Sequence, residues 1–273
     1  MTGDGTVTPA WLALREPADA AARADELADR LARQPPSSGG WVIHDLACGT
    51  GSMGRWLAPL LPGPQHWVLH DRDEALLELA AGDLPRPAAD GAAVTVAARR
   101  SDVTRLHRED LDGATLITAS ALLDMLTADE LAGLVSVCAG AACPILLTLS
   151  VVGGVGLIPA DPLDRRVAAG FIAHQRRMTE RGRLLGPDAV AVAVEQFGRL
   201  SAEVVVRPSP WRLGSVDAEL AAEWFAGWVG AACEQQLELA AEAAPYRRRR
   251  LAQAAAGQLA VTVDHADLLV LPG

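Results

Sequence analysis

The sequence predicts an α/β protein built on a doubly wound, mostly parallel sheet. Short β-branched runs alternate with helical patterns from Trp41 to about Val151, and several of these runs end at an acidic residue or a glycine loop. Strands that alternate with helices form parallel sheets whose ligand loops follow the carboxyl ends of the strands. The chain has 273 residues and is 50% hydrophobic, which supplies a full core.

The individual elements follow from local patterns. Strands are predicted at 41–46, 66–71, 93–102, 114–120, 144–151, 202–208 and 259–272. Helices are predicted at 54–61 and 72–82, from a capping box at 127–130 through 137, from 162 to 182, and from about 187.

Two helical segments flank this pattern. Pro17 suits a first helical turn, and apolar residues then recur at helical spacing through Leu31, so we predict an N-terminal helical cap at 1–40. The α/β domain then spans 41–273. Within it, 216–256 is predicted to be a helical insertion that forms a substrate lid.

Composition excludes several function classes. The net charge of -10 argues against a nucleic-acid partner, because phosphate binding needs concentrated positive charge. The four cysteines form no C-x-x-C pair, so no metal site is predicted. No apolar run approaches the length of a membrane span, and no targeting segment is visible, so we expect a cytoplasmic protein without a membrane partner.

The stretch "DLACGTGSMG", residues 45–54, indicates a nucleotide site. Gly49, Gly51 and Gly54 satisfy the G-x-G-x-x-G fingerprint of NAD-binding folds. The acidic-x-Ala-x-Gly-x-Gly run is also similar to the S-adenosylmethionine loop of class I methyltransferases. The loop alone leaves both cofactors open.

The surrounding residues favour the second cofactor. Asp45 precedes the loop, Asp71 and Asp102 end the next two strands, and "ITASALLDML" follows the fourth strand. Over residues 41–151 this ordered set resembles class I methyltransferases that use S-adenosylmethionine, of the bacterial small-molecule type. A turn or cap at a strand end remains the competing role for each aspartate.

The resemblance implies a set of cofactor residues. Gly49 and Gly51 would let the backbone approach the methionine and ribose parts, Asp71 would accept from the ribose hydroxyls, and Asp102 from the adenine amino group. Ala47 stands where the family has its first glycine. The remaining candidates are Arg23, Asp45, Arg72, Val103 and Ser120. Arg15 and Arg23 flank the leading helix and are candidates to pair with the cofactor carboxylate, with a surface ion pair as the alternative.

The resemblance also implies the reaction. The expected function is methyl transfer to an oxygen or nitrogen of a small molecule, in specialised metabolism. "SALL" stands where adenine-amino methylases of DNA carry [DN]PP[FY]. The alternatives are an NAD(P)-dependent oxidoreductase and a non-catalytic protein that binds S-adenosylmethionine.

Two residues are candidates for proton removal. His174 shares a predicted helical stripe with Val167, Phe171 and Met178, and is either a general base or a core histidine. Asp124 lies in the loop after the fourth strand, where it would orient the base or the substrate, or be a solvated carboxylate.

Aromatic residues supply the substrate candidates. Trp224 and Trp228 share a helix face in the insertion, either as core or as a stacking wall. Trp211 borders the pocket or anchors its loop. Phe171 and Gln175, on the helix of His174, complete the predicted set.

Overall fold

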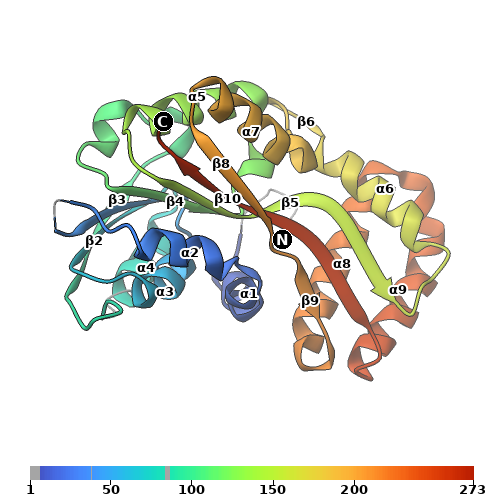
Figure 1. Cartoon of the computed structure of the whole chain (residues 1–273). Helices are drawn as coiled ribbons and strands as arrows, with labels where there is room; N and C mark the ends of the chain where they lie inside the picture. Colours follow the sequence, from blue (N-terminus) through green and yellow to red (C-terminus); the bar gives the residue numbers. More distant parts are fainter. Residues whose placement is uncertain (1–6, 38, 84–86) are drawn as a thin grey trace.

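The protein is organised around one eight-stranded sheet (Figure 1). This computed structural model describes residues 7–37, 39–83 and 87–273. The first five strands are parallel, while β10 runs antiparallel to β5, β8 and β9. The doubly wound, mostly parallel sheet predicted from the sequence is therefore confirmed. Its order is β3 (Val94–Arg100), β2 (Gln65–Asp71), β1 (Trp41–Leu46), β4 (Leu116–Ser120), β5 (Ile145–Ile158), β10 (Ala260–Leu271) and β8 (Glu203–Pro208), with β9 (Trp211–Leu213) on β10.

Helices cover both faces of the sheet because its strands alternate their apolar side chains. Ile43 of β1 faces α2 (Asp25–Ala32), α3 (Ser52–Leu57) and α4 (Glu74–Asp83), with which it shares one core. Leu46 belongs to the core under α5 (Ala128–Gly140) and α7 (Ala189–Arg199). The predicted capping box opens α5, since Thr127 and Glu130 exchange hydrogen bonds with each other's backbone N–H groups.

A second lobe extends from one side of the sheet (Figure 1). The ends of β5 and β10 continue into it, β9 joins them, and the lobe contains α6 (Asp164–Gln175), α8 (Ala218–Gln235) and α9 (Ala240–Ala255). The segment 216–256 thus contributes two helices that pack with α6. Arg250 of α9 is 1% exposed and bonds both oxygens of Asp164 on α6 at 2.6 Å, which ties the two helices together.

The N-terminal helical region differs from the prediction. Helix α1 spans Pro9–Ala22 with Pro17 inside it, and α2 begins at Asp25. The break occurs because Ala24 donates its backbone N–H to Asp267 of β10, 2.8 Å away, instead of continuing the helix. Of the predicted cap at 1–40, residues 1–6 and 38 lie outside the described residues.

The region after β5 also differs. The helix predicted from 162 to 182 begins at Asp164 and ends at Gln175, and a small hairpin follows: β6 (Met178–Thr179) and β7 (Gly182–Arg183). The backbone N–H of Leu185 donates to Leu126 at 2.8 Å, so the hairpin is fastened to the turn after β4. The short 3-10 turns are η1 (Ala58–Leu60), η2 (Val103–Arg105), η3 (Arg108–Leu111), η4 (Leu123–Met125), η5 (Gly186–Asp188), η6 (Ser215–Asp217) and η7 (Leu237–Leu239).

Candidate functional site

The glycine loop between β1 and α3 is forced into left-handed backbone conformations. Gly49 has φ 55° and Gly51 has φ 84°. A Cβ on Gly49 would lie 3.2 Å from the Leu12 side chain of α1, and one on Gly51 would lie 3.2 Å from Ala80 of α4. Ala47 adopts φ 52° despite its Cβ, which explains why glycine suits that position in similar loops. The loop therefore has a tight shape against both helices.

Asp71, at the end of β2, holds this loop in place. Its carboxylate accepts the backbone N–H of Gly49 at 2.9 Å and that of Asp73 at 3.0 Å. It also lines a cleft of about 810 Å³ that runs along the carboxyl ends of β1 to β4. Asp71 thus has a structural role in the loop and also borders the cleft.

Asp102, after β3, has a similar double position. Its Oδ1 caps η2 by accepting from the backbone N–H and the hydroxyl of Thr104, at 3.0 and 2.7 Å. It borders the cleft together with Val103, Arg72 and Arg100. The ends of β2 and β3 therefore give this part of the cleft a polar, charged wall.

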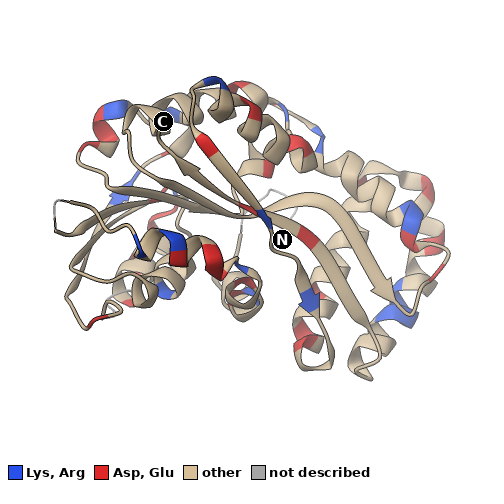
Figure 2. Ribbon diagram, in the orientation of Figure 1, with Lys and Arg blue, Asp and Glu red and all other residues tan. Residues whose placement is uncertain are grey.

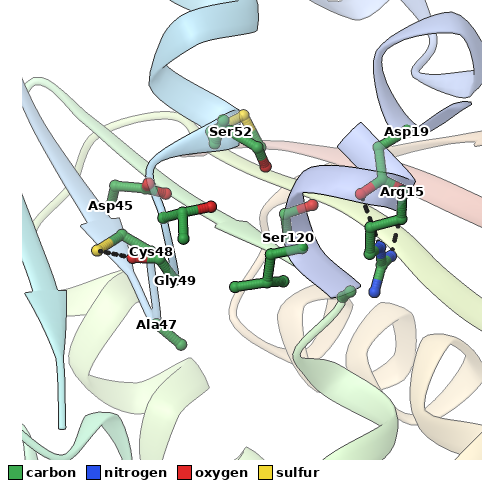
Figure 3. A pocket seen from close by; sticks show the side chains of 12 residues that line it. Arg15, Asp19, Asp45, Ala47, Cys48, Gly49, Ser52 and Ser120 are labelled. Atoms are coloured by element: carbon green, nitrogen blue, oxygen red, sulfur yellow. Dashed lines mark hydrogen bonds and ion pairs between the residues drawn. The ribbon is translucent and has the colours of Figure 1, made fainter. Parts of the chain in front are cut away.

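A smaller cavity of about 50 Å³ adjoins the loop beneath α1 (Figure 3). Asp45 lines it and is 1% exposed. One carboxylate oxygen accepts the Thr118 hydroxyl at 2.7 Å, while the other has no hydrogen-bond partner among the described residues. Burial raises the pKa of Asp45 to about 7. A buried carboxylate with an unused oxygen at a cavity wall suits a cationic ligand group.

Arg23 lies behind the serines of the same cavity and is 3% exposed. Its Nη2 donates to the hydroxyls of Ser52 and Ser120, both at 3.2 Å, and these two serines line the cavity. The guanidinium also stacks on Trp56, and its Nη1 has no partner among the described residues. One wall of the cavity is thus anionic and another is backed by a cation.

Arg15 of α1 borders both cavities. It donates to both carboxylate oxygens of Asp19, at 2.8 and 3.2 Å, and stacks on the ring of Trp211. The Trp211 indole in turn donates to Asp19 at 2.9 Å. Trp211 therefore fastens α1 to β9 from a buried position and lines neither cavity.

The large cleft brings together most of the predicted cofactor residues: Ala47, Gly49, Asp71, Arg72, Asp102, Val103 and Ser120. The small cavity adds Asp45. Gly51 and Arg23 line neither cavity, although Gly51 shapes the loop and Arg23 bonds two lining serines. The grouping arises because parallel strands place their carboxyl ends at one edge of a sheet.

Asp124 lies in η4, beside the cleft. Its neighbours Leu122, Met125 and Leu126 line the cleft, but Asp124 does not. Burial raises its pKa to about 6, although the charges of Arg15 and Arg177 act in the opposite direction. Asp124 is thus more readily protonated than an ordinary aspartate and is next in sequence to Met125, which lines the cleft.

The other predicted residues lie in the second lobe and line neither cavity. His174 pairs with Glu234 of α8 at 3.2 Å, and burial lowers its pKa. The predicted stripe ends with α6, so Met178 lies on β6 and is 73% exposed. Trp224 and Trp228 stack at 5.4 Å within the lobe core, where Phe171 also packs, and Gln175 is buried against Gly186.

Sequence reasoning missed several residues that line the cleft. Leu12 reaches it from α1, Leu122 and Met125 from the turn after β4, and Arg181 from the β6–β7 hairpin. The hairpin was hidden because its residues were assigned to a long helix. The local sequence "RRMTERGR" does not indicate that Arg181 lines a cleft formed by distant parts of the chain.

The chain was compared with known proteins. No family model and no curated protein sequence matches it. A methyltransferase from Geobacter sulfurreducens that uses S-adenosylmethionine, in complex with S-adenosyl-L-homocysteine, is 16% identical, with a TM-score of 0.44 over 97% of this chain and 99% of that one. Magnesium protoporphyrin IX methyltransferase from Synechocystis PCC 6803 is 15% identical, with a TM-score of 0.45 over 77% and 84%. A cyclopropane synthase from Mycobacterium tuberculosis is 14% identical, with a TM-score of 0.46 over 90% and 82%. The function proposed below therefore rests on this chain's own residues.

Within residues 7–37, 39–83 and 87–273, no helix is long and apolar enough to cross a membrane. The same residues contain no group of three or more His, Cys, Asp or Glu side chains arranged to hold a metal ion.

Proposed function

We propose that the protein transfers the methyl group of S-adenosylmethionine to an oxygen or nitrogen of a small molecule. One observation carries the proposal: Asp45, one carboxylate oxygen of which has no hydrogen-bond partner among the described residues, lines the cavity at the glycine loop, and Arg23 lies behind Ser52 and Ser120 on another wall. An amino acid carries a positive and a negative group on one carbon. The two walls complement that pair of charges.

The same cavity argues against a dinucleotide cofactor. In NAD-binding folds the pyrophosphate lies at the glycine loop and the following helix N-terminus. Here the space at the loop is bordered by Asp45, one oxygen of which has no partner among the described residues, and by Asp19, which is paired with Arg15. The buried Asp45 carboxylate would repel a pyrophosphate, so it favours S-adenosylmethionine over NAD(P).

The large cleft would hold the rest of the cofactor. Asp71 is proposed to accept from the ribose hydroxyls with the lone pairs that Gly49 and Asp73 leave unused. Asp102 would accept from the adenine amino group through Oδ2, because its Oδ1 caps η2. Val103 would pack against the adenine ring.

Proton removal is assigned to Asp124 in preference to His174. S-adenosylmethionine supplies a methyl group already activated on a sulfonium sulfur, so the chain has to align the acceptor and take its proton. A carboxyl with a pKa of about 6 is suited to accept a proton near neutral pH. Asp124 lies on the turn that lines the cleft, whereas His174 lies in the second lobe, paired with Glu234.

Calorimetry tests the cofactor assignment. S-adenosylmethionine and S-adenosylhomocysteine are expected to bind, while NAD and NADP give no heat. Asp45→Asn, which keeps the shape but removes the charge, should weaken binding of both adenosyl ligands. Asp90→Asn, a matched change in an exposed turn, should leave it unchanged. NAD binding without heat from S-adenosylmethionine would support the oxidoreductase alternative instead.

An acceptor screen tests catalysis. The full chain with labelled S-adenosylmethionine and a library of small hydroxyl, amine and acid compounds should give label transfer to at least one class. Binding of the cofactor without transfer to any acceptor would favour the non-catalytic alternative.

A further inference from the structure

The large cleft has two arms of different chemistry. Because the sheet order is β3-β2-β1-β4-β5, the loops after β2 and β3 lie on one side of β1 and the turn after β4 lies on the other. The first side, here called the cofactor arm, is bordered by Asp71, Asp73, Glu74 and Asp102 together with Arg72 and Arg100. The other side, here called the acceptor arm, is bordered by α1, the turn after β4 and the β6–β7 hairpin.

The acceptor arm is apolar and has no acidic lining residue within the described chain. Its apolar side chains come from Leu12, Leu122, Leu126 and Met125, the last of which is 37% exposed. An exposed methionine on a cleft wall adapts its shape to an apolar ligand. The charged lining residues of this arm are Arg15 and Arg181. Each guanidinium group is paired with a carboxylate that does not line the arm, Arg15 with Asp19 and Arg181 with Glu130.

Arg181 is held at the edge of this arm, and some of its N–H donors remain available to a ligand. Its Nη1 donates to Glu130 at 2.6 Å and its Nη2 makes a long contact of 3.4 Å with the carbonyl of Met125. Its Nε makes no hydrogen bond with the described residues. Glu130 also accepts the backbone N–H of Thr127 in the α5 capping box, so it shares its negative charge with the start of that helix.

The hairpin that carries Arg181 is a fixed part of the cleft. Leu184 bridges to Thr127, and the backbone N–H of Leu185 donates to Leu126. Arg15, on α1, donates from Nε and Nη2 to Asp19, and these two bonds leave its Nη1 available. Both guanidinium groups are therefore preorganised, which reduces the entropy lost when they bind a ligand.

We propose that the methyl acceptor is a small amphiphile: its apolar body packs on Leu122, Met125 and Leu126, and its carboxylate is bound by Arg181. The inference rests on the proposed function, which assigns the other arm to the cofactor and leaves this arm for the methyl acceptor. A carboxylate fits better than a phosphate, because Glu130 stays bonded to Arg181 and repels a dianion more strongly than a monoanion.

Calorimetry on the full chain, with and without saturating S-adenosylhomocysteine, tests the proposal. The probes are octanoate, octanamide and octyl phosphate, and 2-naphthoate with 2-naphthamide. We expect each carboxylate to bind about tenfold tighter than its amide, since a charge-assisted hydrogen bond is lost in the amide. In Arg181→Gln this ratio should fall to about one, with an unchanged affinity for S-adenosylhomocysteine. Arg183→Gln, an exposed arginine on the same hairpin outside the cleft, should keep the ratio.

Each contrary result has a separate meaning. Equal binding of acid and amide, loss of the ratio in Arg183→Gln, or no binding of any probe would overturn the proposal while leaving cofactor binding intact. Tighter binding of octyl phosphate than octanoate would overturn the carboxylate assignment. Failure of S-adenosylhomocysteine to bind would overturn the proposed function, and the titrations without it would then decide whether Arg181 still distinguishes acids from amides.

Discussion

The sheet half of the molecule and the second lobe are built from different kinds of contact. Around β1 to β4, the residues that border the cleft sit at consecutive strand ends, and short loops place them (Figure 1). The second lobe is held by partners far apart in sequence, such as Arg250 with Asp164. Charged residues occur on the lobe helices as well as on the sheet half (Figure 2). Local sequence thus encodes the cofactor site, and long-range packing encodes the lobe.

The largest expected effect concerns the lobe core. Trp228→Ala removes a side chain that is 2% exposed and stacked on Trp224, and should reduce the free energy of unfolding by about 3–5 kcal/mol. Urea denaturation followed by circular dichroism measures it. Leu237→Ala, 79% exposed, is the control and should change little. Equal losses in the two variants would contradict a packed lobe core.

Catalysis should depend on the sheet half more than on the lobe. Asp124→Asn should lower turnover by about 10²–10⁴-fold with nearly unchanged affinity for S-adenosylmethionine, because it removes a proton acceptor and keeps the shape. His174→Asn should have a smaller effect on turnover, since His174 lies outside the cleft. Rates at saturating cofactor with an acceptor from the screen measure both. The opposite ranking would return the role of base to His174.

The ribose contact provides a more moderate test. Asp71→Ala should weaken S-adenosylmethionine binding by roughly 1.5–3 kcal/mol, the usual size for hydrogen bonds to a charged group. Asp71→Asn should weaken binding of S-adenosylmethionine by a smaller amount, because the amide oxygen still accepts the backbone N–H of Gly49. Calorimetric affinities separate a ligand contact from loop support. An unchanged affinity in both variants would limit Asp71 to a structural role.

The smallest expected effect is the release of a proton from Asp45 when S-adenosylmethionine binds. The raised pKa of Asp45, about 7, means that the free protein is partly protonated there at neutral pH. A cationic ligand group beside it lowers that pKa, so binding of S-adenosylmethionine should release about half a proton at pH 7. Affinity should therefore rise as pH increases from 6 to 8. Calorimetry in buffers of different ionisation enthalpy measures the release, and Asp45→Asn should abolish it.

The raised pKa of Asp45 also makes the stability of the fold depend on pH. Because the folded-state pKa of Asp45 is raised above the ordinary value of 3.8, its protonated form favours the fold at low pH, and this contribution is lost as pH rises from about 4 through about 7. His44 and His70, bonded at 3.0 Å, have pKa values lowered to about 4 by burial, so their contribution to stability is lost as pH falls from 6.5 through 4. The two effects oppose each other in the ligand-free chain.

The sequence predicts best what a few neighbouring residues determine. The capping box at Thr127 and the end of β2 at Asp71 follow from local patterns and are confirmed. β3 ends at Arg100, two residues before the predicted end at Asp102, because Asp102 caps η2 instead. The helix break at Ala24 depends on Asp267, 243 residues away. No local signal marks such a partner, which is why one continuous helix was expected there.

The second lobe illustrates the same limit. β9 has three residues and exists because it pairs with β10, so its own sequence reads as a loop. α6 ends at Gln175, where Gly186 approaches closely, and the residues beyond form the hairpin that brings Arg181 to the cleft. Helical periodicity predicts that Phe171, His174 and Trp228 face inward, but it does not indicate which interior they face.

The position of α1 has a kinetic consequence. Leu12 and Arg15 belong to the walls of both the small cavity and the large cleft, so a molecule in the acceptor arm lies next to the path into the cavity beneath α1. We therefore expect a compulsory order, in which the cofactor enters before the acceptor and the methylated product leaves before S-adenosylhomocysteine. S-adenosylhomocysteine would then inhibit competitively against S-adenosylmethionine, and the methylated product would not.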